Sequence, residues 1–209
     1  QAGEGIVKGV SLDNNIVCTA EKEIIAVASI ADPLKASMAR HGAYELSPSE
    51  LQKLEKVVVE DGHANKKWVG KDIAKILGEI GVQAPHGTLI AYGEVPEHHP
   101  FVQAELLMPV TGLVRVASAR EGIHMAVRCE HGNGHTASMY SKNIDNMHMS
   151  WAFATVRQSD EKLFVTMVSA AQPQVSEFNA QKFTNTACAF ATGTRPGEEL
   201  FAAVARAVE

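Results

Sequence analysis

Short apolar runs rich in isoleucine and valine alternate along this chain with stretches whose apolar residues recur at helical spacing. The runs predict buried strands, and the apolar stripes predict helices that pack on them. Regular alternation of the two is typical of an α/β fold, in which a mainly parallel sheet is flanked by helices. In such sheets, functional residues usually gather in loops beyond the carboxyl ends of the strands.

Helix start and stop signals sharpen this prediction. Asp32-Pro33 and Ser47-Pro48-Ser49-Glu50 are typical starts, with Asp32 as an N-cap and Ser47 to Glu50 as a capping box. Gly42 and Gly81 are typical stops. The predicted strands are about 23–30, 88–95, 113–116, 136–141 and 163–168, and the predicted helices about 32–41, 47–58, 69–80, 118–130, 143–154 and 196–208.

Composition limits the classes of function. The chain has 209 residues, 45% of them hydrophobic, which is enough for one domain over residues 1–209 with a sizeable core. Its net charge of -5 argues against nucleic-acid binding, and no apolar run approaches the roughly 18 residues of a membrane span. Cys18, Cys129 and Cys188 lack metal-ligand spacing, so we expect free thiols in a reducing cytoplasm and no metal site.

Cys18 is the candidate nucleophile. It closes the polar stretch Asp13-Asn14-Asn15-Ile16-Val17-Cys18, just ahead of the predicted strand 23–30. A catalytic thiol needs partial exposure and surroundings that favour the thiolate, and a loop at the mouth of a strand provides the exposure. The alternative is a structural thiol, which is the commoner role of a lone cysteine.

The sequence segments around Cys18 and further along the chain resemble the catalytic domain of the CoA-acylating aldehyde dehydrogenases, which oxidise acetaldehyde or propionaldehyde to acyl-CoA. The resemblance covers about residues 6–146, whereas residues 147–209 depart from the family. The segments that carry it are Ile6-Val7-Lys8-Gly9, Asp13-Asn14-Asn15-Ile16-Val17-Cys18, Glu21-Lys22, Trp68-Val69-Gly70-Lys71-Asp72, His99-Pro100-Phe101, Glu105-Leu106-Leu107-Met108-Pro109-Val110, Gly134-His135-Thr136-Ala137 and Ser141-Lys142-Asn143-Ile144-Asp145-Asn146.

This resemblance implies a reaction and its co-substrates. The Cys18 thiolate would attack a short-chain aldehyde, hydride would pass to NAD or NADP, and coenzyme A would release the resulting thioester as acyl-CoA. The candidate oxyanion donors are the backbone N–H of Cys18 and one side-chain amide, which the family takes from its cofactor domain. Asn15 is the candidate amide on this loop, but the residue type favours a role for Asn14 and Asn15 in shaping the turn. Members of the family carry an N-terminal nucleotide-binding domain, and no Gly-rich dinucleotide fingerprint is found here, so we expect a catalytic domain without that nucleotide-binding domain.

Two further residues gain a role from the resemblance. Glu105 matches the family's glutamate that holds the nicotinamide ribose. A carboxylate suits that role because it accepts hydrogen bonds from hydroxyls. The alternative is a surface glutamate near a strand start. His135 matches a histidine near the family's site and could take the proton of the coenzyme A thiol. The alternative is a histidine that bonds only to backbone.

Two rival functions stay open at this point. One is a non-catalytic assembly or binding domain of the same fold, and the other is a cysteine acyltransferase or thioesterase that works without nicotinamide. The family resemblance also implies a possible homo-oligomer, located in the cytoplasm or in the lumen of a bacterial microcompartment.

Overall fold

The computed structural model describes residues 1–133, 137–147 and 150. The chain divides into two compact units, one of residues 1–131 together with the described residues 137–140, and one formed by the remaining residues. The helices and strands of the first unit are α1 (Ala2–Ser11), the 3-10 helix η1 (Leu12–Asn15), β1 (Glu23–Val27), α2 (Ala28–Arg40), β2 (Ala43–Glu45), α3 (Pro48–Val58), β3 (Val59–Glu60), β4 (His63–Ala64), α4 (Ile73–Glu79), β5 (Ile90–Glu94), α5 (Pro100–Gln103), β6 (Val110–Val116) and α6 (Ala119–Cys129).

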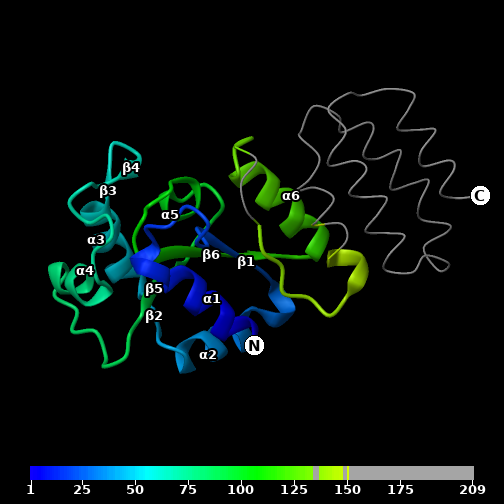
Figure 1. The fold of residues 1–209 in the computed structure, drawn as a ribbon, viewed down its shortest axis with the longest axis horizontal. Coiled ribbons are helices and arrows are strands. Elements are labelled where there is room, and N and C mark those ends of the chain that lie inside the picture. Colours follow the sequence, from blue (N-terminus) through cyan, green and yellow to red (C-terminus); the bar gives the residue numbers. More distant parts are fainter. Residues whose placement is uncertain (134–136, 148–149, 151–209) are drawn as a thin grey trace, which may run out of the picture. The chain divides into compact units, whose positions relative to one another are not determined.

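The centre of this unit is a four-stranded sheet with the strand order β1-β6-β5-β2 (Figure 1). Every pairing in it is parallel, with Glu23 opposite Gly112 and Ala91 opposite Val110. The predicted α/β architecture with a mainly parallel sheet is therefore confirmed. The prediction of one domain over residues 1–209 stays a prediction.

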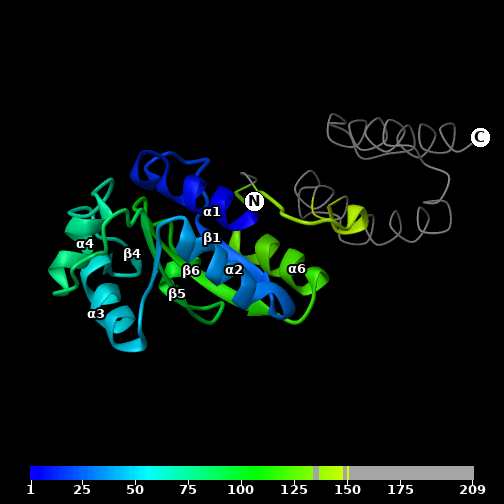
Figure 2. The same ribbon diagram turned by 90° about the horizontal axis from the view of Figure 1, so that it is seen from below.

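Helices cover both faces of the sheet (Figures 1 and 2). One face packs against α1 and α2 through a core that includes Ile24, Tyr92 and Leu113. The other face packs against α3, α4, α5 and α6 in two further clusters, which contain Ala91 and Val114 respectively. Because side chains alternate across a strand, the near-continuous apolar strand β6 supplies residues to both layers.

Several helix boundaries follow the predicted capping chemistry. The Ser47 hydroxyl accepts from the Glu50 N–H while the Glu50 carboxylate accepts from the Ser47 N–H, so the predicted capping box of α3 is confirmed. The α6 start is capped by Ser118, which accepts from Glu121. Gly42 follows the end of α2 with a φ of +99°, in the left-handed region that glycine tolerates best.

Other boundaries were predicted wrongly. The strand predicted over 23–30 ends at Val27, and α2 begins at Ala28, so Asp32 is not the cap and Pro33 lies inside the helix. Small residues at this junction suit either element, and apolar periodicity alone does not separate them. The helix predicted over 69–80 begins only at Ile73, because Gly70 is left-handed and Asp72 provides the cap.

The sequence prediction also missed elements. It contained neither α1 nor the β3–β4 hairpin, whose Asp61-Gly62 turn has both residues at positive φ, as a tight hairpin turn requires. Residues 137–141 are not a strand. The elements predicted over 163–168 and 196–208 lie outside the described residues, as does the end of the helix predicted over 143–154. Among the described helices, none has the length and apolar character needed to cross a membrane.

Candidate active site at the Cys18 loop

Cys18 lies in the loop between η1 and β1, with an exposed side chain and a free thiol. We call residues 13–22 the Cys18 loop; it starts within η1 with three consecutive left-handed residues, Asp13, Asn14 and Asn15, at φ of 47°, 51° and 61°. Aspartate and asparagine tolerate this region better than other non-glycine residues, which explains the composition of the stretch. These three residues follow the C-cap of α1 directly and lead to the exposed Cys18.

Asn15 holds this loop from the inside. The residue is only 8% exposed, and its Nδ2 donates to the carbonyl of Val10 at 2.9 Å and to the carbonyl of Glu21 at 3.0 Å. Both amide hydrogens are thereby used within the chain. This geometry favours the loop-shaping role of Asn15 over the donation of a side-chain N–H to a substrate oxygen.

Asn14 ties the same loop to two other segments that the sequence singled out. Its Nδ2 donates to the carbonyl of Gly70 at 3.2 Å, and the Gly70 N–H donates to the carbonyl of Leu107 at 2.8 Å. Gly70 and Leu107 are both left-handed, at φ of 66° and 55°. The motifs around Cys18, Trp68 and Glu105 therefore meet at one place.

Glu105 lies in the third of these segments, on the loop that leads into β6. Its side chain is exposed, whereas Leu106 and Met108 are buried and anchor the loop in the core beside Trp68. A carboxylate displayed in this way can accept hydrogen bonds from ligand hydroxyls. His135 and Cys188 lie outside the described residues.

The Cys18 and Glu105 loops lie at the amino ends of their strands. The two loops precede β1 and β6, which run parallel, so both loops lie at the same end of the sheet. The prediction of a site beyond the carboxyl ends is therefore wrong for these residues. That rule reflects ligand binding in the crevice of open, doubly wound sheets, and here the motif loops are joined at the opposite edge.

Charged side chains surround the start of β1. The Nζ of Lys22 donates to the carbonyl of Cys129 at 3.0 Å and lies 3.8 Å from the Glu23 carboxylate. Burial raises the pKa of Glu23, and Lys22 opposes that shift only in part. The buried hydroxyl of Thr111 donates to the Lys22 carbonyl at 2.6 Å and pins this strand end to β6.

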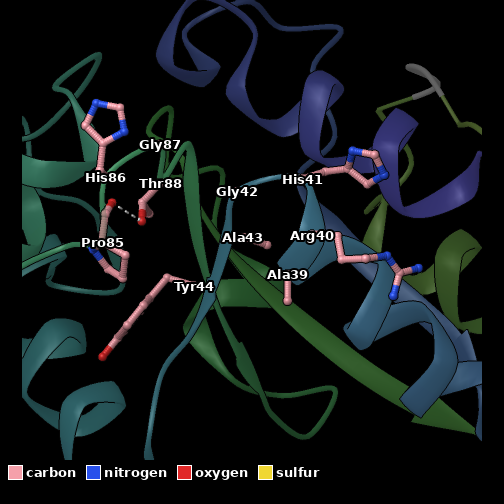
Figure 3. Close-up of a pocket in the computed structure, with 10 residues that line it drawn as sticks. All are labelled: Ala39, Arg40, His41, Gly42, Ala43, Tyr44, Pro85, His86, Gly87 and Thr88. Carbon is pink, nitrogen blue, oxygen red and sulfur yellow. Dashed lines mark hydrogen bonds between the residues drawn. The ribbon is translucent and has the colours of Figure 1, made fainter.

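A separate pocket of about 430 Å³ lies where α2 runs into β2, facing the loop before β5 (Figure 3). It is lined by residues 39–44 and 85–88, which include none of the candidate residues. Thr88 donates to the Pro85 carbonyl at 2.8 Å on its wall. The rings of His41 and His86 lie on opposite sides and point apart (Figure 3), so these two imidazoles do not converge on a common ligand.

Comparison with known proteins identifies relatives of this chain. No family model matches the chain. The acetylating acetaldehyde dehydrogenase EutE of Salmonella typhimurium is 42% identical over 154 residues, which are 71% of this chain and 33% of that protein. A propionaldehyde dehydrogenase of Rhodopseudomonas palustris, solved with CoA and an acylated cysteine, is 42% identical with a TM-score of 0.72 over 73% of this chain and 35% of that one. An engineered glycolyl-CoA reductase with bound NADP+ is 44% identical, with the same TM-score of 0.72 and coverages of 73% and 35%.

The matched part of this chain is homologous to the CoA-acylating aldehyde dehydrogenases. The resemblance inferred from the sequence and the catalytic-domain-like fold are thus confirmed. The chain spans about a third of the length of the relatives it matches.

The sequence prediction missed Gly70 as the residue that joins the two candidate loops. It placed residues 69–80 in a helix, which hid a left-handed glycine at the junction of two loops. The signal was present, since a glycine ahead of the Asp72 cap interrupts any continuous helix there. In the described part of the chain, no three metal-ligating side chains form a cluster, and the groups that the site offers are a thiol and carboxylates.

Proposed function

We propose that this chain carries the nucleophile of a CoA-acylating aldehyde dehydrogenase, which converts a short-chain aldehyde, coenzyme A and NAD or NADP to acyl-CoA and the reduced cofactor. The observation that carries the proposal is an exposed, free Cys18 on a clamped loop, in a chain 42% identical to a dehydrogenase with bound CoA and an acylated cysteine. A thiol is both a strong nucleophile and a fair leaving group, as a thioester mechanism demands.

The first half of the reaction forms the thioester. The Cys18 sulfur attacks the carbonyl carbon of the aldehyde, and the carbonyl oxygen becomes an oxyanion. We assign the backbone N–H of Cys18 as one donor to that oxyanion, because Asn15 already spends its side-chain N–H groups on Val10 and Glu21. Loss of hydride from the same carbon restores the carbonyl and leaves an acyl group on Cys18.

The second half releases the product. The sulfur of coenzyme A attacks the thioester carbon, and Cys18 leaves as the thiolate. In the proposal, His135 takes the proton of the incoming thiol, which suits an imidazole near neutral pH.

A nicotinamide cofactor, when bound, would supply the hydride acceptor. Among the described residues, Glu105 suits its ribose, because the exposed carboxylate stands on a loop joined through Gly70 to the Cys18 loop. We also propose, on the family resemblance, a homo-oligomer that resides in the cytoplasm or a bacterial microcompartment.

Acyl transfer from propionyl-CoA tests the proposal without a hydride acceptor, because it is the reverse of the second half-reaction. Intact-mass spectrometry should show one propionyl group on the parent protein and none on Cys18→Ala. Addition of coenzyme A should remove that group, whereas an acyltransferase or thioesterase would pass it to another acceptor or to water. A folded parent that gains no propionyl group would overturn the proposed function and favour a binding or assembly role.

A further inference from the structure

Gly70 occupies a backbone position that favours glycine. Its φ is +66°, a region that L residues rarely adopt, and a Cβ built on it would lie 3.2 Å from Cδ1 of Ile16. Ile16 is two residues before Cys18 and belongs to the same loop. The glycine therefore permits both a left-handed turn and a close approach of the Cys18 loop.

Gly70 also bonds in both directions. Its carbonyl accepts a hydrogen bond from the Asn14 side chain, and its N–H donates to the Leu107 carbonyl. The backbone of Gly70 alone therefore connects the Cys18 loop with the Glu105 loop. Each outer loop is itself fixed to the body of the unit. Asn15 fixes the first through a buried hydrogen bond to Val10 and a partly buried one to Glu21, and Leu106 and Met108 fix the second by burial in the core.

Backbone strain is concentrated at this junction. Of the six non-glycine residues with positive φ in the described part of the chain, four belong to the two loops that Gly70 joins: Asp13, Asn14, Asn15 and Leu107. Leucine is an unusual occupant of this region, and strain of this kind persists only where the surroundings impose it. Strained backbone gathers at functional sites, where it fixes a geometry that relaxed chain would not hold.

We propose that Gly70 is a positioning residue that couples the Cys18 loop to the Glu105 loop. It thereby fixes the position of the nucleophile Cys18 relative to Glu105, which holds the cofactor. This inference rests on the proposed function for its chemical consequence, whereas the coupling itself is a property of the fold. It adds to the reaction a residue that touches neither substrate nor cofactor.

Matched variants separate coupling from general strain. Gly70→Ala adds a Cβ at positive φ against Ile16, whereas Gly81→Ala adds one at a similar φ of +76° with no atom within 4 Å. Ile16→Val removes the Cδ1 atom, after which the nearest Ile16 atom lies 3.9 Å from the added Cβ. Asn14→Ala removes the donor to Gly70 without touching the Glu105 loop.

Hydrogen exchange measures the coupling directly. We expect Asn14→Ala and Gly70→Ala to raise deuterium uptake in the peptide that contains Leu107 as well as in the peptide that contains Cys18. Gly81→Ala should leave both peptides at the parent level, with circular dichroism unchanged in all variants. Uptake that rises in the mutated loop alone would overturn the coupling.

Acyl transfer from propionyl-CoA measures the consequence. Gly70→Ala should slow acylation of Cys18 about tenfold or more, since small displacements of reacting groups carry rate penalties of this order, and Ile16→Val should restore most of the rate. Equal rates for Gly70→Ala and Gly81→Ala would overturn the positioning role. A parent that is not acylated at all would overturn the proposed function instead, and the exchange result would still decide the coupling.

Discussion

The side chain of Asn15 donates to the backbone carbonyl of Glu21 at 3.0 Å and so closes the chain around Cys18, which lies between them. The same nitrogen reaches back to the end of α1, where it donates to the Val10 carbonyl at 2.9 Å. One buried amide thus determines where the loop leaves the helix and where it enters β1. Cys18 is exposed, but the loop that carries it is fixed.

Asn15→Ala should destabilise the fold by about 1–3 kcal/mol, because it leaves two backbone carbonyls without their donor in a buried setting. Asn15→Asp should be no better at neutral pH, since an ionised carboxylate has no hydrogen to donate and faces two acceptors. Asn14→Ala, which removes one hydrogen bond at a partly buried site, is the matched control and should cost less. Urea unfolding measures all three, and equal stabilities for the two alanine variants would contradict the clamp.

The fold was largely predictable from the sequence where local chemistry decides it. The capping box of Ser47 and Glu50 and the helix stop at Gly81 depend on residues close together in the chain, so the local sequence locates them. The start of α2 was not predictable in this way. Ala31 is fully buried between helix and sheet, and such tertiary packing is absent from a local pattern of small residues.

The candidate site was predictable in its parts and not in its arrangement. Cys18 and Glu105 were found through family resemblance, which says nothing of which loops touch. Their connection runs through two hydrogen bonds, one from Asn14 to Gly70, which are 56 residues apart, and one from Gly70 to Leu107. Spacing along the chain does not encode such contacts.

Glu94 should make the fold sensitive to acid. The Arg115 guanidinium, together with Lys35, holds the pKa of Glu94 at about 2, with Arg115 Nε 2.6 Å and Lys35 Nζ 2.9 Å from its carboxylate oxygens. A pKa lowered by folding adds stability that is complete above the unfolded value of about 4.3 and is lost as the pH falls toward 2. The parent should therefore lose stability more steeply than Glu94→Gln between about pH 5 and pH 2. Urea titrations across that interval test this, and parallel curves would contradict it.

Glu23 should change the pH dependence of stability in the opposite direction to Glu94. Burial raises its pKa, so the folded state binds the proton more tightly than the unfolded chain does. Its contribution to stability is complete below the unfolded value of about 4.3 and is lost as the pH rises through the folded pKa. Glu23→Gln keeps the shape and removes the charge, so its stability should fall less than that of the parent from about pH 4 to pH 7. An equal decline in both proteins would count against a desolvated carboxylate at the start of β1.

Gly42 should tolerate alanine poorly, because two penalties coincide there. Its φ is +99°, and an added Cβ would lie 2.5 Å from the carbonyl oxygen of Gly87, a backbone atom that no side-chain rotation can move. The same residue accepts from the Leu89 N–H at 2.8 Å and so aligns β2 with the chain entering β5.

Gly62→Ala is the matched control, since its φ is +78° and the space around it is open. It should cost about 1–2 kcal/mol from the left-handed backbone alone, and Gly42→Ala should cost distinctly more. Thermal and urea unfolding of the two variants measure the difference, and equal losses would show that the strand junction gives way where the structure holds it rigid.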